Sequence, residues 1–407
     1  MAVSQGHTMI ILPRPRDPGS AESPELAQGL LPGRITMRWI FASVIALHGL
    51  LHLLGFLKAF GWYEPTQLTV AIPKAWGFAW LAAAVAVVVT AGMIGTDSRG
   101  WWALGLGALV LSQAAILSAW PDAKFGSVVN ALLLLGCLYG MFAVGPYGLA
   151  AEYQRAVSQR LPDTLAPEKV TEADLTDLPA PVQRFLRHSG VVGRPRVHNV
   201  RAVWRGRIRG TATDPWMEFT AEQHNFVREP TRLFFMNASR SGLPVDVYHV
   251  FSKRAATMQV RLLSVLPLVD AQGPELTRAE TVTLFNDLCL LAPSELVDPS
   301  IRWEAIDEGQ ARGRYTVGAN TISAVLSVDE EGNLLDFVSD DRLALSSNGK
   351  GFVQQRWSTP IREHQVIGSI RAMHHGEGWW HPSEGAYAYL EIELVDLKVN
   401  LTSSPGH

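Results

Sequence analysis

The sequence predicts two parts: an all-α unit of four transmembrane helices, then a soluble α+β domain. We expect that domain to hold a large curved, mostly antiparallel sheet with about two packed helices. Two observations carry this prediction. Apolar residues crowd into four runs between Trp39 and Tyr147, each of roughly the 20 residues that cross a bilayer. After Val197 the apolar residues instead recur at every second position, which is the period of a β-strand.

Composition divides the chain into five expected segments. They are a disordered arm (1–36), the transmembrane unit (37–149), a linker (150–180), the sheet domain (181–400) and a disordered tail (401–407). The arm has many prolines and glycines and no apolar period. Because Met37 directly precedes the first apolar run, we hypothesise that translation begins there. A peptide from residues 1–30 in the native protein would contradict this.

The four spans are expected at 39–60, 75–94, 101–120 and 128–147, and in lipid such runs must be helical to pair their backbone groups. Tryptophans and tyrosines gather near the span ends, as aromatic belts do. Four spans return the chain to its starting side, which has several arginines where the opposite loops have lysines: Arg34, Arg38, Arg99, Arg155 and Arg160 against Lys58, Lys74 and Lys124. This bias predicts a multi-pass cell-membrane protein with its sheet domain in the cytoplasm.

Polar residues inside the spans form the first candidate site. His48 and His52 are four residues apart and share one helix face. Gln113 and Asn130 are the buried polar candidates of the third and fourth spans. We favour a hydrogen-bonded cluster that holds the helices together. A proton-transfer or small-ligand site is the alternative, because ionisable groups at membrane depth are usually functional.

A few residues in the sheet domain clearly indicate helix ends and turns. A short helix is expected over 181–188, ended by Gly190. A second helix is expected over 277–292, with Thr277 and Glu280 as a capping box and Pro293 as its end. Hairpin turns are expected at 329–333 and at Asn348-Gly349. Cys137 and Cys289 are expected to be buried, unpaired small hydrophobes.

Two stretches of the sheet domain could carry chemistry. His374–Glu384 holds three histidines and two carboxylates, which are zinc-ligand types, but their spacing matches no established metal motif. We expect a solvated loop between strands there and assign no metal or cofactor. On a strand, Glu222 and His224 share one face and offer an acid–base pair, although a solvent-facing polar row is the interpretation we favour.

The sequence lacks the motifs that mark several classes of enzyme. The chain has no Gly-x-Ser-x-Gly elbow, no glycine-rich phosphate loop after a strand and no Cys-x-x-Cys, so no catalytic residue is assigned. The formal net charge of −3 gives no reason to expect nucleic acid.

Several stretches together resemble a known family. They are His48-Gly-Leu-Leu-His52, 120–126 with Asn130, 178–186 with Gly190, 219–223, 303–307 with Ala311, and Gly332 with Arg342. This pattern resembles a family of uncharacterised bacterial membrane proteins that join four transmembrane helices to a domain of unknown function. The C-terminal part is also similar, at fold level, to lipoprotein carriers of the LolA/LolB type, whose curved sheet surrounds helices and holds acyl chains.

Our leading hypothesis is a membrane protein whose sheet domain binds a hydrophobic or lipid-like ligand next to the bilayer. Composition and resemblance together select Trp216, Glu222, Tyr248, Trp303 and Arg342 as ligand-binding candidates. One alternative is a membrane-tethered enzyme, such as a metal-dependent hydrolase that uses Glu222 or the 374–384 stretch; its zinc content would test it. The other is an interaction or sensor scaffold whose sheet is filled, with the 277–292 helix capping a solid core. The expected partners are the bilayer and a lipid; ligand identity and oligomeric state are not encoded in any pattern we find.

Overall fold

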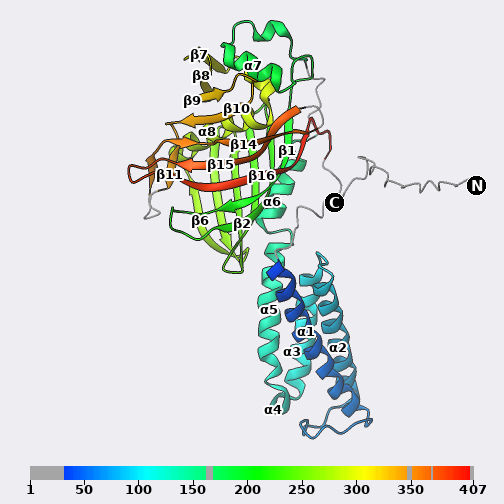
Figure 1. Ribbon diagram of the computed structural model, residues 1–407. Coiled ribbons are helices and arrows are strands. Elements are labelled where there is room, and N and C mark those ends of the chain that lie inside the picture. The colour runs from blue at the N-terminus through cyan, green and yellow to red at the C-terminus, as the bar shows by residue number, and fades with distance from the viewer. Residues whose placement is uncertain (1–31, 162–167, 346–350, 368–369, 404–407) are drawn as a thin grey trace, which may run out of the picture.

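A computed structural model describes residues 32–161, 168–345, 351–367 and 370–403. A bundle of long helices and a sheet domain lie end to end (Figure 1). Residues 1–31 lie outside the described residues, as do most of the expected C-terminal tail and the expected turn Asn348-Gly349.

Four helices of the described residues are long and apolar enough to cross a membrane. They are α1 (Pro32–Ala59), α2 (Lys74–Gly95), α3 (Trp101–Ser118) and α5 (Gly126–Ala143), with the single turn α4 (Trp120–Ala123) before α5. Helix α1 begins before Met37, inside the segment expected to be disordered. Helix α5 ends earlier than expected, because Gly145 and Pro146 follow it and proline has no N–H to continue a helix.

Small residues let the four helices approach one another. A Cβ atom on Gly136 would lie 2.4 Å from the ring of Phe41 on α1, and one on Gly140 would lie 2.4 Å from the ring of Trp101 on α3. The small-residue pair of α5 therefore packs within the bundle. Leu50, Val110, Leu135 and other large apolar side chains face outward and are exposed, as expected of surfaces that contact lipid.

The sheet domain is one large antiparallel sheet plus a separate hairpin. Its strands are β1 (Asn199–Ile208), β2 (Met217–Phe226), β3 (Thr231–Arg240), β4 (Leu243–Ser252), β5 (Ala255–Leu262), β6 (Leu266–Gln272), β7 (Ile301–Ala305), β8 (Gln310–Val317), β9 (Asn320–Val328), β10 (Leu334–Ser339), β11 (Leu343–Leu345), β12 (Phe352–Gln354), β13 (Trp357–Ser358), β14 (Ile361–Ile367), β15 (Ile370–Trp380) and β16 (Tyr387–Val399). Among the described residues, fourteen strands form the sheet in the order β6-β5-β4-β3-β2-β1-β16-β15-β13-β10-β9-β8-β7, with β14 beside β15; β11 and β12 pair separately. The fold class predicted from the sequence is confirmed, including the turn at 329–333 between β9 and β10.

Helix α8 (Pro274–Leu291) lies against the inner face of the curved sheet and is buried along almost its whole length (Figure 1). It begins earlier than expected, because Gly273 adopts a φ of +126° and Pro274 occupies the first turn. The predicted capping box is therefore wrong. The Thr277 hydroxyl donates to the Gly273 carbonyl inside the first turn, and Glu280 makes ion pairs instead. Both cysteines are buried and unpaired, as predicted.

Other short helices complete the domain. Helix α7 (Ala180–His188) is the one predicted before Gly190, and two 3-10 turns span Glu172–Leu175 and Pro293–Val297. Helix α6 (Leu149–Ser158) occupies the start of the expected linker. It has one strongly apolar face, and that face packs against the outer side of β3 and β4.

The stretch from His374 to Trp380 is not a loop but the second half of β15, so that prediction is wrong. Its glycines reflect crowding, not flexibility. A Cβ on Gly378 would lie 2.8 Å from the ring of Tyr389, and one on Gly376 would lie 2.5 Å from the sulfur of Met373. Only residues from His381 to Ala386 connect β15 to β16.

Candidate functional site

The outer face of the sheet is joined to the membrane unit through α6. Tyr153 on α6 packs against Phe235 and Tyr248, and its hydroxyl lies 2.6 Å from Nδ1 of His224 on β2. His224 is 1% exposed. Burial, with a smaller contribution from the charge of Arg201, lowers the pKa of His224 to about 3, so the ring is neutral and can accept a hydrogen bond from the Tyr153 hydroxyl.

Glu222 lies beside this contact but is already paired. Its Oε1 accepts from Nε of Arg201 at 2.8 Å, and Arg201 also donates to Asp396 on β16 at 2.9 Å. The Glu222 carboxylate is 4.0 Å from His224, too far for a direct hydrogen bond. Glu222 thus belongs to a salt-bridge network across β2, β1 and β16, not to a poised acid–base pair.

The inner face of the sheet is filled by α8 and its charged side chains. Glu280 pairs with Arg342 at 3.0 Å, with His249 at 3.4 Å and with Arg232 at 3.5 Å. Burial alone would raise the pKa of Glu280, but these three neighbours outweigh it and hold the pKa well below its ordinary value. A charged carboxylate is thereby stabilised at the centre of the domain.

Asp287 lies two helical turns after Glu280 and therefore points to the same strands. Its Oδ2 accepts three hydrogen bonds, from Gln223 at 2.7 Å, Arg232 at 2.9 Å and Asn225 at 3.0 Å. On the other side of α8, the ring of Phe285 packs against Trp303 and Tyr315. Helix α8 thus divides the interior into a polar and an aromatic half, and its own side chains occupy both.

The end of the sheet nearest the helices is fixed by the pairing of α6 with β4. The rings of Tyr153 and Tyr248 are 6.1 Å apart, and Arg160, two residues after α6, donates to Ser252 at the far end of β4. Going back from Tyr248 to Leu243 covers roughly 17 Å of strand. Going back from Tyr153 to Leu149, the first residue of α6, covers roughly 6 Å at the helical rise, and residues 144–148 then lead to the end of α5. Leu243 therefore lies at the end of β4 that points toward the helix bundle.

This end of the sheet is apolar. Its turns and the adjoining edge strand expose large aliphatic side chains, which we call the apolar tip: Leu243 (46%), Val265 (37%), Leu266 (51%) and Leu268 (53%). Val245, two residues after Leu243, pairs with Leu262 on β5, and Leu262 pairs with Leu266 across the β5–β6 turn. The register thus gathers the four side chains at one corner of the domain.

Trp216 lies in the turn before β2, at the same end of the sheet as the β3–β4 turn, because Phe219 pairs with Ala238. Two guanidinium groups lie over its ring, those of Arg209 at 4.4 Å and Arg207 at 4.7 Å, and Arg207 also pairs with Glu391. An indole beside arginines combines an apolar ring with charged groups, a pairing that suits a lipid–water boundary.

The polar residues inside the helix bundle form a continuous network. His48 Nε2 lies 3.0 Å from Asn130 Oδ1 and 3.2 Å from the Ser112 hydroxyl. That hydroxyl is also 2.9 Å from His52 Nε2, and Asn130 donates to Gln113 at 3.0 Å. His52 Nδ1 donates to the His48 carbonyl at 2.9 Å. The structure brings the four expected residues together through Ser112, which the sequence reading missed because a single serine in an apolar run is not distinctive.

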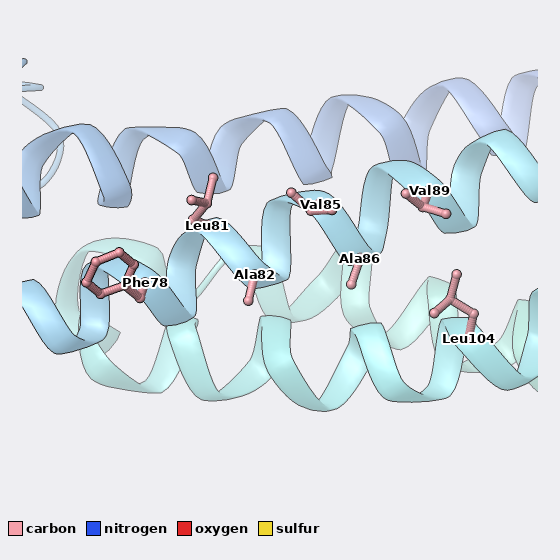
Figure 2. A pocket seen from close by; sticks show the side chains of 7 residues that line it. All are labelled: Phe78, Leu81, Ala82, Val85, Ala86, Val89 and Leu104. Atoms are coloured by element: carbon pink, nitrogen blue, oxygen red, sulfur yellow. The ribbon is translucent and has the colours of Figure 1, made fainter.

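The bundle also carries a shallow apolar groove of about 510 Å³ on its outer side (Figure 2). Its walls are side chains of α2 and one of α3: Phe78, Leu81, Ala82, Val85, Ala86, Val89 and Leu104. With no polar group in its lining, the groove offers no specificity beyond packing against a hydrocarbon chain.

The five ligand-binding candidates are not brought to one place. Glu222 and Tyr248 lie on the outer face beneath α6, whereas Arg342 lies inside the curve beside Glu280. Trp303 also lies inside and donates to the Leu296 carbonyl at 3.0 Å. Trp216 alone lies at the end of the sheet that carries the apolar tip. The aliphatic tip residues were missed because exposure cannot be read from an alternating apolar pattern.

Comparisons with known proteins identify a family and a distant fold likeness. A family of unknown function, DUF6544, matches residues 168–392. No curated protein matches the sequence. Two solved structures are similar to this chain. One is a domain from Vibrio parahaemolyticus described as an outer membrane lipoprotein-sorting protein, with 10% identity, a TM-score of 0.30, and coverage of 49% of this chain and 85% of that one.

The other is a LolA superfamily protein from Nitrosomonas europaea, with 11% identity, a TM-score of 0.30, and coverage of 53% of this chain and 92% of that one. At such low similarity neither ligand nor activity transfers to this chain. The family match covers more than half of the sequence and includes most of the sheet domain, and on that ground the chain belongs to DUF6544, a family of unknown function.

Proposed function

We propose that the chain is a multi-pass membrane protein whose sheet domain binds lipid at the bilayer surface through the apolar tip. One observation carries the proposal: four exposed aliphatic side chains gather at one corner of the sheet, at the end of β4 and β5 that points toward the helix bundle. A soluble surface rarely exposes such a cluster, and one beside a membrane is typical of a lipid contact.

The energetics favour insertion of the tip. Each fully buried aliphatic side chain contributes about 1.5–3 kcal/mol, so even half of that from four residues exceeds the cost of ordering them. Trp216, beside Arg207 and Arg209, would lie at headgroup level, where indole rings are favoured and guanidinium groups meet phosphates.

The filled interior supports binding at this corner instead of inside the sheet. Helix α8 occupies the inner face, and its buried ion pairs leave a charged centre that is unsuited to an acyl chain. The tip thus acts as the lipid-binding surface, and the interior acts as its rigid support.

The arginines near this side of the bundle, with Arg38 at the start of α1 and Arg155 on α6, support a cytoplasmic sheet domain. A cysteine introduced at the exposed Glu308 tests this. In intact cells it should resist a membrane-impermeant maleimide and react only after permeabilisation. Labelling in intact cells would place the domain outside.

Site-specific fluorescence tests the lipid contact in the full chain. Cys137 and Cys289 are both buried, so a Leu266→Cys variant can be labelled selectively with NBD and placed in phospholipid nanodiscs. We expect blue-shifted NBD emission that is quenched by lipids with nitroxide groups near the headgroup. Glu308→Cys, in the turn between β7 and β8, is the matched control and should stay unquenched. Equal, water-like emission at both positions would reject the proposal.

A further inference from the structure

Strands β14 and β15 carry a second cluster of functional side chains. Strand β14 pairs with β15 so that Glu363 faces His375 and His364 faces Met373. His374 is therefore an extra residue in β15, which is the arrangement of a β-bulge. In a regular strand two successive side chains would point to opposite faces.

The bulge cancels that alternation. The rings of His374 and His375 lie on one side, with centroids 4.1 Å apart. Glu363 joins them: its Oε2 is 3.1 Å from Nδ1 of His375. One potential ligand atom from each of the three residues lies within 4.8 Å of the others. Two imidazoles and a carboxylate thus converge on a space that a single ion can fill with small rotamer adjustments.

The surroundings resemble the support of a metal centre. Nε2 of His375 faces Glu393 on β16 at 3.8 Å, and the Arg205 guanidinium holds that carboxylate through two hydrogen-bonding nitrogens. At 3.8 Å the Glu393 carboxylate makes no hydrogen bond to the ring, but it places a second negative charge beside the imidazole. Nδ1 of His374 is buried and has no hydrogen-bond partner among the described residues, so this nitrogen is not committed to another group.

We propose that Glu363, His374 and His375 bind a divalent transition-metal ion of the Zn²⁺ class. Imidazole nitrogen and carboxylate oxygen are ligands that zinc accepts in tetrahedral sites. Three protein ligands leave one position for water or for a substrate oxygen, because the cluster lies at the surface of the edge strand β14.

The proposed metal site differs from one built only from residues 374–384. His381 is outside the cluster, because its Nε2 lies 2.8 Å from the Ser358 hydroxyl. Glu377 and Glu384 are also outside it; the former pairs with Arg362 at 2.7 Å. Glu363 replaces them, and only the bulged pairing of β14 with β15 brings it there.

Cobalt titration of the full chain tests the proposal. The protein is purified in detergent without a polyhistidine tag, stripped with chelator and titrated with Co²⁺, whose visible absorption reports imidazole coordination. We expect one Co²⁺ per chain, displaced by Zn²⁺. His374→Ala and His375→Ala should each weaken binding by more than about 100-fold, and Glu363→Gln should weaken it at least tenfold. His381→Ala, the matched control, should bind as the natural chain does.

A second measurement separates loss of the site from loss of the fold. Zn²⁺ should raise the thermal unfolding midpoint of the natural chain and of His381→Ala, but not that of the three ligand variants, whose metal-free midpoints should stay close to that of the natural chain. Absent binding by the natural chain, or unchanged binding in the His374 and His375 variants, would overturn the proposal.

Discussion

The hydroxyl of Tyr153 lies 2.6 Å from Nδ1 of His224, and this contact joins α6, the helix that follows the four-helix bundle, to the second strand of the sheet. Around it, Leu149, Val157 and Leu161 of the same segment pack on Leu233. Because α6 follows α5 after a short turn, this interface sets the height of the sheet domain above the helices and hence the position of the apolar tip.

Removing the Tyr153 hydroxyl should weaken this interface while its side-chain packing is kept. Tyr153→Phe keeps the ring packing on Phe235 but leaves His224 Nδ1 buried without a donor. We expect a loss of about 1–3 kcal/mol in the free energy of unfolding. Thermal unfolding of the full chain in detergent measures it. Tyr147→Phe, at an exposed position, is the control and should leave the midpoint unchanged.

His224 should make the domain sensitive to acid. Its pKa is about 3 in the folded protein and about 6.5 when exposed, so its stabilising contribution is complete above pH 6.5 and is lost as the pH falls toward 3. At pH 5 the loss is roughly 2 kcal/mol. His224→Gln, which keeps an acceptor for Tyr153, should flatten the decline of the unfolding midpoint between pH 7 and pH 5. An equally steep decline in the variant would contradict the assignment.

Asp336 should have the opposite effect on the pH dependence of stability. Burial raises its pKa to about 6, although its own carboxylate accepts the Phe337 amide at 2.8 Å. A raised carboxyl pKa stabilises the fold below the ordinary value near pH 4, and this contribution is lost as the pH rises through about 6. Asp336→Asn should therefore be more stable than the natural chain at pH 7, by up to about 3 kcal/mol, and show little advantage at pH 4. Unfolding midpoints at the two pH values decide this.

The ion pairs of α8 should be essential to the domain. Glu280→Ala leaves Arg342, Arg232 and His249 without their shared carboxylate in the interior. We expect a loss of about 3–5 kcal/mol. Glu275→Ala, an exposed position on the same helix, should change stability by less than about 0.5 kcal/mol. Equal midpoints for the two variants would show that the Glu280 pairs do not support the fold.

The sequence predicts elements well where one physical rule dominates. Four apolar runs can only be helices in lipid, and the alternation around Leu390 can only be a strand. Prediction from the sequence fails where contacts between distant segments determine the structure. The stretch after His374 has glycines because Tyr389 and Met373 crowd the strand, and composition alone cannot distinguish this from a flexible loop. Glu280 fits a capping pattern in the sequence, yet arginines from distant strands bind it.

The candidate sites show the same division. His48 and His52 are recognisable because histidines are rare at membrane depth, whereas Ser112, which links them to Asn130, is not. The apolar tip and the Glu363 cluster depend on strand register and on a bulge, neither of which the local sequence specifies.

Photo-crosslinking tests the central claim, that the sheet domain contacts lipid, most directly. The full chain is placed in nanodiscs with a phospholipid that carries a diazirine near the top of its acyl chain, irradiated and mapped by peptide mass spectrometry. We expect lipid adducts on Leu243 and on 265–268, in addition to those on the helices. In Leu243→Glu/Leu266→Glu these sheet adducts should disappear while the helix adducts remain. Adducts confined to the four helices in the natural chain would show that the sheet domain does not contact lipid.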